Sequence, residues 1–552
     1  MSHPDLCLHP RSIITGWDFS TGEVKCLAFD LRGKVVAEVR LPTELWHGDP
    51  PDPNISELNL FQLEGQARAS VRGIAAQLQR KGRLQDWVAG GISATHHTAG
   101  RIDAHAVPVR RAICWNDQTL AAYRAAGEAR LGGKDVVQKL LGGPWADRYT
   151  LSHLVKDEDA DAPGDDQRYL KLADWKRTHR ILLHGPLAAG YLTGNFDVTS
   201  VSSAASTGIM NLATRRWNRK MLGALADERY RRLAWKQLPR IIEYDQPIGP
   251  LSAGLAEEVG CDPNARPLIY PTSDDQQAGL VGGGAVNAGQ LAVILGNSAV
   301  VNSSSAQLPA VQDLDVMCLS WGPYLLMRCY SNGAPALNTA VGAHPGWSGE
   351  AWSRLEAEAE AVPPGSRGNL FLPFLAAEPS LGIGERNKGL RWLRRRGGEW
   401  LEGNPPQRRG VRRRASLEAL AYLIALGVRA HRQAQQALGQ TIDQITVSGG
   451  VARSDLMCQI LATVLDCRLH RLANEEGPAL GAAVTALAAH ESALRRQQGH
   501  NEPFTVANAV ATLVRYRDPV EPYEPWRAAY QQGLEQFEQQ LEARVTRESL
   551  TV

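Results

Sequence analysis

Glycine- and serine-rich turns that could hold a phosphate group recur along the sequence. They are Asp18–Gly22, Gly296–Ser298 and Ser448–Gly450. Residues with small side chains let backbone N–H groups approach a polyanion closely, so each turn is a candidate phosphate cradle. One such turn is weak evidence, because strand-connecting turns use the same residues for conformational reasons. Their order along the chain is more informative.

Two adjacent aspartates, Asp274 and Asp275, precede Gln276 and Gln277. A carboxylate beside a bound phosphate could accept the proton of an attacking hydroxyl. It could equally cap the helix that the Gln-Gln-Ala run begins, and both roles can coexist. The sequence contains no motif of the P-loop, protein-kinase or α/β-hydrolase type.

Short strands and amphipathic helices must position these residues. The predicted elements are a three-stranded meander within 12–41, a helix at Leu60–Leu78, a strand at Trp87–Ser93, a strand–turn–strand unit at Gly289–Ser305, a strand at Ile445–Val447, and a helix with Ser454 as N-cap. The second strand–turn–strand unit resembles the opening of the first, so the chain is expected to contain two related lobes. Pro525–Val545 is predicted to be a packing helix, with a partner-binding helix as the alternative.

Composition indicates a soluble protein with a small-molecule partner. Of 552 residues, 43% are hydrophobic, and 60 Lys and Arg nearly balance 58 Asp and Glu, so neither nucleic acid nor a membrane is expected to bind. Eight cysteines without a CxxC pair predict neither a zinc site nor disulfides and fit the cytoplasm. The longest apolar run, Ala419–Val428, is too short to span a bilayer. The basic stretch Arg391–Arg414 is interpreted as a solvated loop, with a polyanion patch as the alternative.

The order of these motifs resembles that of the FGGY carbohydrate kinases, with xylulokinases the most similar branch. The matching stretches are Gly16–Lys25, Gly91–Gly100, Ile113–Thr119, Ser273–Gly284, Ile294–Val301, Phe371–Leu375, Val447–Leu465 and Glu476–Ala483. The resemblance implies an α/β fold of two ribonuclease-H-like domains, as in actin and hexokinase, with sugar and ATP in the cleft between them. It assigns residues 1–10 to a tail, 11–268 to the N-terminal domain, 269–490 to the C-terminal domain and 491–552 to an extension.

The resemblance also implies a role for each candidate residue. The expected reaction is transfer of the γ-phosphoryl group of ATP to a ketose, D-xylulose first, giving D-xylulose 5-phosphate, with Mg²⁺ on the phosphates. The implied roles are Asp275 as catalytic base; His97, Asp117, Arg148, Asp275 and Gln276 as sugar ligands; Asp18 as the Mg²⁺ ligand; Thr21, Gly22, Gly296, Asn297 and Ser298 as phosphate ligands; and Gly449, Gly450 and Ser454 as adenosine contacts. A homodimer is compatible with this interpretation.

Several alternatives remain open at this stage. Ribulose, rhamnulose, gluconate or glycerol could be the acceptor, because motif turns do not encode hydroxyl placement. Ser20, His96, Asn297 and the segment 376–379, where relatives carry Glu-Arg-Thr-Pro, depart from the family pattern and leave an inactive regulatory protein as a rival. Asp274 could share the role of Asp275. A metal site at His96, His97 and His105 is disfavoured, because adjacent residues of a strand point to opposite faces.

Overall fold

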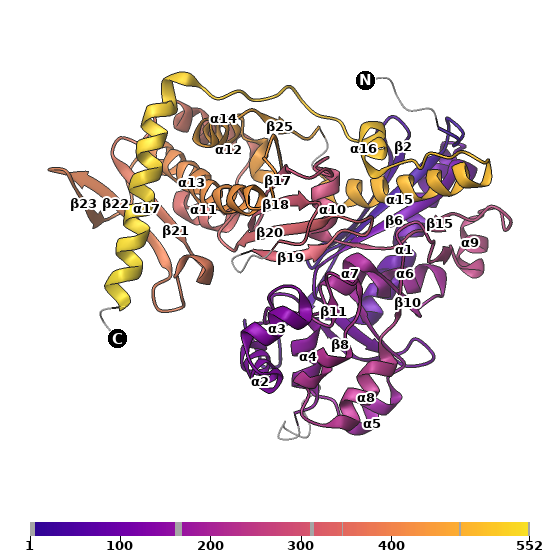
Figure 1. Cartoon of the computed structure of the whole chain (residues 1–552). Helices are drawn as coiled ribbons and strands as arrows, with labels where there is room; N and C mark the ends of the chain where they lie inside the picture. The colour runs from indigo at the N-terminus through magenta and orange to yellow at the C-terminus, as the bar shows by residue number, and fades with distance from the viewer. Residues whose placement is uncertain (1–5, 160–167, 310–313, 345, 474–475, 550–552) are drawn as a thin grey trace. The chain divides into compact units, whose positions relative to one another are not determined.

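The computed structural model describes residues 6–159, 168–309, 314–344, 346–473 and 476–549, with the side chains of 547–549 excepted (Figure 1). Residues 1–5 of the predicted tail and 550–552 of the predicted extension lie outside this range. The described residues form two compact units. Unit 1 takes in Met1–Ala288, Ser304–Leu325 and Glu476–Val514, and unit 2 takes in Gly289–Ser303, Leu326–Glu475 and Arg515–Val552.

Unit 1 is built on two sheets with helices around them. The larger sheet has the order β14-β15-β6-β1-β2-β3, with β16 also paired to β6, and the smaller sheet has the order β4-β5-β8-β7-β9. The strands are β1 Ile13–Phe19, β2 Glu23–Asp30, β3 Val35–Pro42, β4 Leu45–Trp46, β5 Glu57–Leu58, β6 Trp87–Ala94, β7 Ala99–Ile102, β8 Pro108–Ile113, β9 Arg180–Leu183, β10 Val198–Ser200, β11 Met210–Asn211, β12 Arg216–Trp217, β13 Arg240–Ile242, β14 Gly249–Pro250, β15 Leu268–Ile269, β16 Ser273–Asp274 and β19 Asp315–Cys318.

The helices of unit 1 follow the predicted apolar spacing. They are α1 Leu60–Arg80, α2 Ala121–Leu131, α3 Lys134–Leu141, α4 Thr150–Asp157, α5 Leu172–Arg177, α6 His184–Thr193, α7 Val201–Ala205, α8 Glu228–Gln237, α9 Ala253–Val259, α10 Asp275–Gly282, α15 Gly477–Gln497 and α16 Val506–Leu513, with 3-10 turns η1 Leu84–Asp86 and η2 Arg219–Ala224. In α1, Asn59 caps the Phe61 N–H at 3.0 Å, and Leu63, Val71 and Ile74 are fully buried, as an amphipathic helix requires.

Unit 2 repeats the pairing scheme of unit 1. Its main sheet contains β20-β18-β17-β24-β25, and its second sheet has the order β21-β22-β23. The elements are β17 Gln290–Leu295, β18 Ala299–Ser305, β20 Tyr324–Tyr330, β21 Asn369–Phe374, β22 Gly389–Arg396, β23 Glu399–Gly403, β24 Gln444–Ser448, β25 Leu469–Arg471, α11 Ala334–Val341, α12 Gly349–Glu360, α13 Arg409–Gln436, α14 Asp455–Leu465, α17 Arg527–Ser549 and 3-10 turns η3 Pro379–Leu381, η4 Gly450–Arg453 and η5 Glu524–Trp526. In unit 1, β1 pairs with β2 antiparallel and with β6 parallel; in unit 2, β17 pairs with β18 antiparallel and with β24 parallel.

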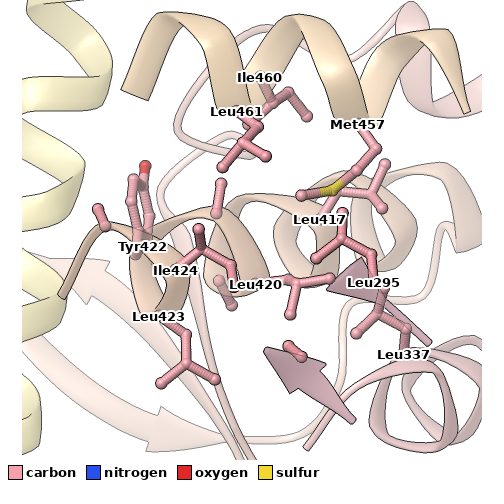
Figure 2. Packing of buried hydrophobic residues seen from close by; sticks show 14 of the residues in the cluster. Leu295, Leu337, Leu417, Leu420, Tyr422, Leu423, Ile424, Met457, Ile460 and Leu461 are labelled. Atoms are coloured by element: carbon pink, nitrogen blue, oxygen red, sulfur yellow. The ribbon is translucent and has the colours of Figure 1, made fainter. Parts of the chain in front are cut away.

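The core of unit 2 is a cluster of leucine, isoleucine and aromatic side chains between its sheet and helices α13 and α14 (Figure 2). Leu295 at the end of β17 and Leu337 of α11 both belong to it. Burial of each such side chain stabilises the fold by roughly 1.5–3 kcal/mol. The cluster therefore anchors the strand and the helix that flank the turn at Gly296.

Glycines let α15 lie directly on the sheet of unit 1. A Cβ at Gly16 of β1 would lie 1.8 Å from the Ala479 carbonyl oxygen, and one at Gly91 of β6 would lie 2.1 Å from that of Ala482. Gly481 makes the same close approach to α10, where a Cβ would meet the Ala278 oxygen at 1.8 Å. These contacts hold α10 and α15 in unit 1, whereas the sequence placed residues 269–490 in one C-terminal domain.

The interpretation of Arg391–Arg414 as a solvated loop is correct for the exposed arginines at 394–396, 408 and 409, but wrong in calling the segment a loop and for its C-terminal end. The segment forms β22, β23 and the first turns of α13, and Arg413 and Arg414 are buried. Arg413 pairs with Glu356 at 2.6 Å, while Arg414 pairs with Glu418 at 3.1 Å. Buried charges are tolerated because each has a partner of opposite sign.

The predicted C-terminal packing helix is confirmed, although α17 begins at Arg527 and Pro525 lies in the preceding 3-10 turn. Tyr530 and Phe537 are buried against the core of unit 2. Within the described part of the chain, no helix combines the length and apolar character needed to cross a bilayer.

Candidate active-site residues

In unit 1, the parallel strands β1, β6 and β16 bring three polar residues together near the carboxyl ends of these strands. Asp18 of β1 lies opposite Ser93 of β6, and Ser93 lies opposite Ser273 of β16. The Ser93 hydroxyl donates to Asp18 Oδ1 at 3.0 Å. Because α10 starts directly after β16, Asp275 enters the same region, and its charge acts on Asp18.

Burial makes both of these carboxylates weaker acids. Loss of hydration, together with the negative charge of Asp275, raises the pKa of Asp18 to about 7, against the opposing effects of Lys25 and the Ser93 hydroxyl. Burial also raises the pKa of Asp275 to about 6, opposed by the backbone N–H groups of Gln276 and His96. In the described part of the chain, Asp275 Oδ1 is buried without a hydrogen-bond partner. It is an oxygen that can accept a proton near neutral pH.

Asp274 is bound by protein groups on both oxygens, unlike Asp275. The Ser203 hydroxyl donates to Oδ1 at 2.9 Å, and the Ser206 hydroxyl donates to Oδ2. His96 Nε2 lies 3.8 Å from Oδ2. Burial raises the pKa of Asp274 to about 6, and His96 and the two hydroxyls oppose this rise. Asp274 occupies the N-cap position of α10, but its side chain makes no capping hydrogen bond.

His97 offers one nitrogen to a ligand. Its backbone is left-handed, with φ of 60°, and its ring stacks on Tyr149 at 4.5 Å between centroids. Nδ1 lies 2.8 Å from the Ser206 carbonyl oxygen, so it must carry the proton and donate. Burial, together with His96 and Arg148, lowers the pKa of His97 well below its ordinary value. Nε2 is buried and, among the described residues, has no partner, which suits it to accept from a hydroxyl.

The two adjacent histidines do not lie on a strand as the sequence suggested. Both follow the end of β6 at Ala94, and their rings meet edge to face at 4.9 Å. The left-handed backbone at His97 is the reason that the rings turn toward each other. The described residues contain no group of three or more His, Cys, Asp and Glu placed to hold a metal ion.

Arg148 forms an ion pair with Asp315, and its guanidinium lies 6.0 Å from the centre of the Tyr149 ring. Arg148 remains about one-third exposed. Gln276, which follows Asp275, is half-buried.

The oxygens of Asp117 are already bound by the protein. Oδ1 accepts from the Thr119 N–H at 3.0 Å, while Oδ2 accepts from the Ser56 N–H at 3.0 Å and from Arg168 at 2.9 Å. These contacts order the loop after β8. They give Asp117 a structural role and do not support it as a sugar ligand.

Sequence reasoning missed the side chains that surround Asp274 and His97. Ser203 of α7 and Ser206, just beyond it, bind the Asp274 carboxylate, and the Ser206 carbonyl binds His97. Gln277 Oε1 contacts Nε2 of the neighbouring His96. The serine-rich run Ser200–Thr207 was a usable signal, since a cluster of small hydroxyl residues is suited to surround a buried carboxylate.

The turn at Gly296–Ser298 in unit 2 presents the N–H groups of Asn297 and Ser298 outward, whereas the Gly296 N–H donates to the Ser298 oxygen at 2.9 Å. Its carbonyls are taken by α11, because the Ala334 N–H donates to the Gly296 oxygen at 2.9 Å and the Gly333 N–H donates to the Asn297 oxygen at 3.1 Å. In a trans peptide the N–H points opposite to the C=O. The N–H groups of Asn297 and Ser298 therefore point away from α11, as phosphate ligands must.

The turn after β24 lies against this first turn. Gly449 has φ of 93°, and a Cβ there would lie 2.5 Å from the Leu295 oxygen, so only glycine fits. Gly450 faces open space. Beside them is a small hollow lined by Val447, Ser448, Gly449, Ala452, Arg471, Leu472 and Arg517.

Ser454 is the N-cap of α14, as predicted. Its hydroxyl accepts from the Met457 N–H at 3.0 Å and donates to Glu356 at 2.8 Å. Both hydrogen bonds are internal to the protein, so Ser454 orders the helix start behind Gly450.

The turn at Ser20–Gly22 in unit 1 is closed by its own serine. The Ser20 hydroxyl donates to the Glu23 oxygen at 2.8 Å and accepts from the Glu23 N–H at 3.2 Å. Thr21 is half-buried and Gly22 is exposed, with nothing within 4 Å of a Cβ built there. The tip is therefore accessible to a ligand.

Comparison with known proteins places this geometry in a family. The model for the N-terminal domain of the FGGY family of carbohydrate kinases matches residues 13–282, and that for the C-terminal domain matches residues 336–490. A xylulose kinase of Escherichia coli (strain K12) is 27% identical over 490 residues, which cover 85% of this chain and 88% of that protein.

Solved structures agree on the fold. A ligand-bound xylulose kinase of Lactobacillus acidophilus superposes with a TM-score of 0.77 at 18% identity, covering 96% of this chain and 98% of that one. A gluconate kinase of the same organism also superposes with a TM-score of 0.77, at 17% identity and with 97% and 98% coverage.

The chain belongs to the FGGY family of carbohydrate kinases. It is a carbohydrate kinase, an enzyme that transfers a phosphoryl group to an alcohol group of a carbohydrate. The phosphate donor of this family is ATP. The predicted actin- and hexokinase-like fold is confirmed.

Proposed function

We propose that the protein phosphorylates D-xylulose with ATP and that Asp275 is the base. The observation that carries the proposal is the buried, unpartnered Oδ1 of Asp275 on a carboxyl group with a pKa of about 6. Such a group is ionised at neutral pH and ready to take a proton. Asp274 is less suited to this role, because a serine hydroxyl already binds each of its oxygens.

In the proposed reaction, the acceptor hydroxyl oxygen attacks the γ-phosphorus of ATP. The new O–P bond forms as the bond from the γ-phosphorus to the β–γ bridging oxygen breaks, and ADP leaves. The hydroxyl proton passes to Asp275 Oδ1. Positioning and charge stabilisation supply most of the acceleration in phosphoryl transfer, and general-base catalysis contributes about 10²–10⁴-fold.

Other unit 1 residues would orient the acceptor. His97 Nε2 can accept from one hydroxyl, Gln276 can donate and accept beside Asp275, and Arg148 can donate from its exposed part.

Asp18 fits the role of a ligand for Mg²⁺ or its waters. Burial disfavours the ionised form of Asp18, and a nearby cation would stabilise that form, since its charge replaces the lost hydration. The ion would supply positive charge to the phosphates. Thr21 and Gly22, the N–H groups of Asn297 and Ser298, and the Gly449–Gly450 turn would bind the nucleotide.

A neutral polyol suits the site better than a sugar acid. The pairing of Arg148 with Asp315 neutralises the guanidinium charge that a gluconate carboxylate would need. The similarity to a gluconate kinase structure keeps gluconate as the second candidate acceptor.

ADP release tests the proposal. Purified protein with Mg-ATP is supplied in turn with D-xylulose, D- and L-ribulose, L-rhamnulose, glycerol and gluconate, beside the Asp275→Asn variant. Turnover with D-xylulose that the variant lacks supports the proposal. Turnover with gluconate alone reassigns the acceptor, and no turnover with any of them favours the inactive regulatory protein.

A further inference from the structure

We infer that Asn332 and Glu378 form a clamp that positions the phosphate-binding turn Gly296–Ser298 through Gly333. The inference rests on the proposed role of this turn in holding ATP. Both are positioning residues, because they act through the backbone and not on the nucleotide itself.

Asn332 is held by hydrogen bonds on every polar group of its side chain. Its Nδ2 donates to Glu378 Oε1 at 2.8 Å and to the Ala376 oxygen at 3.0 Å, and its Oδ1 accepts from the Ala376 N–H at 2.7 Å. Its backbone N–H also donates to Glu378 Oε1, at 3.1 Å. Asn332 is 1% exposed and Glu378 2% exposed, so water does not compete for these bonds.

Glu378 is itself fixed at the base of a closed loop. Its N–H donates to the Ile383 oxygen at 2.7 Å, and its carbonyl accepts from the Ile383 N–H at 3.1 Å. The loop between these bonds contains η3. The glutamate therefore presents its carboxylate from a rigid base.

The clamp fixes the residue that precedes Gly333, and Gly333 touches the turn. A Cβ at Gly333 would lie 2.5 Å from the Gly296 oxygen and 2.6 Å from the Asn297 oxygen, so the two backbones are in direct contact. The N–H groups of Gly333 and Ala334 hold the turn carbonyls, which aims the Asn297 and Ser298 N–H groups outward. Loss of the clamp frees Gly333 to move and misaligns those donors.

Glu378 lies in the segment 376–379, next to the backbone of Ala376 that Asn332 binds. A glutamate in this place gives the clamp a titratable member. Burial raises the pKa of Glu378 to about 7, while the Asn332 side chain, the backbone N–H groups of Ser331 and Asn332, and Arg328 of β20 lower it. Burial raises the pKa of the neighbouring Tyr330 phenol of β20, which Arg328 lowers and the charge of Glu378 raises.

Nucleotide binding in the absence of sugar tests the clamp. Calorimetry measures the Kd of Mg-AMPPNP and of adenosine for the full chain and for Glu378→Ala, Asn332→Ala and Glu378→Gln. The matched control is Glu418→Gln, because Glu418 is also a buried, hydrogen-bonded glutamate of unit 2 and contacts Gly365, Ser366 and Arg414.

We expect Glu378→Ala and Asn332→Ala to raise the Kd of Mg-AMPPNP about tenfold, the effect of losing one well-formed hydrogen bond, with adenosine affinity within about twofold. Glu418→Gln lowers the Tm and leaves the ratio of the two affinities unchanged. Equal loss of both ligands in Glu378→Ala, or no loss, overturns the clamp. Absence of Mg-AMPPNP binding by the unmodified protein overturns the proposed ATP site, and the clamp with it.

The isosteric variant Glu378→Gln provides a second test of the clamp if the alanine variants do not fold. Protonation of the carboxylate weakens it as an acceptor, so the Mg-AMPPNP Kd of the unmodified protein rises more steeply than that of Glu378→Gln as pH falls from 8 to 6. Ligand protonation is common to both proteins and cancels in the comparison. Parallel profiles contradict the clamp.

Discussion

Asp275→Asn separates the catalytic role of this side chain from its effect on stability. The amide has the shape of the carboxyl group but cannot accept the hydroxyl proton, so we expect kcat to fall about 10²–10⁴-fold with little change in the KM for ATP. For the unmodified enzyme, the pKa of about 6 predicts that kcat/KM with D-xylulose at pH 5 is at least about tenfold below its value at pH 8, since ionisation of Asp18 adds to that of Asp275.

The same substitution is expected to stabilise the fold at high pH. The pKa of Asp275 is raised from 3.8 to about 6, so the folded state favours the protonated form. The stability associated with this group is complete below about pH 4 and is lost as pH rises through 6, a cost of about 3 kcal/mol. Asn removes that cost, so the Tm of the variant should exceed that of the unmodified protein at pH 8 and not at pH 4.

Steady-state kinetics from pH 5 to 8 and thermal melts at pH 4 and 8 measure both effects. Asp274→Asn is the matched control, because it changes the neighbouring carboxyl group, which accepts from Ser203 and Ser206. A fully active Asp275→Asn enzyme, or activity at pH 5 equal to that at pH 7, would refute the reasoning.

Three further substitutions test how the fold positions the site. Gly481→Val places a side chain where the Ala278 oxygen would lie 1.8 Å from Cβ, so it should lower the free energy of unfolding by several kcal/mol or prevent folding. Expression and thermal melting measure this effect, and an unchanged Tm would contradict the close approach. Ser454→Ala removes the cap of α14, which should cost about 1 kcal/mol in denaturant unfolding with the KM for ATP within about twofold, and a large KM rise would instead indicate direct nucleotide contact. Arg414→Ala leaves Glu418 buried without its cation and should cost about 3–5 kcal/mol, whereas a loss below 1 kcal/mol would show that the pair is not buried in solution.

Helices and strands could be predicted from the sequence because burial of one face sets the spacing of their apolar residues. The meander at β1–β3, helix α1 and the Ser454 cap of α14 all occupy the predicted residues within a few positions. The turns that we propose bind phosphate do form turns, and small residues mark places where two backbones meet. Gly449 against Leu295 and Gly333 against Gly296 are such meetings.

Features that depend on distant partners could not be predicted. Arg413 was interpreted as exposed because its partner, Glu356, lies on another helix, α12. Asp274 differs from Asp275 only through Ser203 and Ser206, and no local pattern reveals that these hydroxyls reach it.

Backbone conformation and hydrogen-bond occupancy also decide roles that residue type leaves open. His97 has a left-handed backbone and its ring stacks on Tyr149, and no residue pattern near it predicts either feature. Asp117 has the residue type of a sugar ligand, yet Arg168, Ser56 and Thr119 bind its oxygens.

Identification of the product tests whether the protein phosphorylates D-xylulose. The protein is incubated with Mg-ATP and D-xylulose, and the phosphorylated sugar is observed by ³¹P NMR beside Asp275→Asn. We expect a phosphomonoester on the carbon-five hydroxyl, formed with equimolar ADP and at least about 10²-fold more slowly by the variant. ADP formed without sugar phosphate, or the same product made at an undiminished rate by Asp275→Asn, would contradict it.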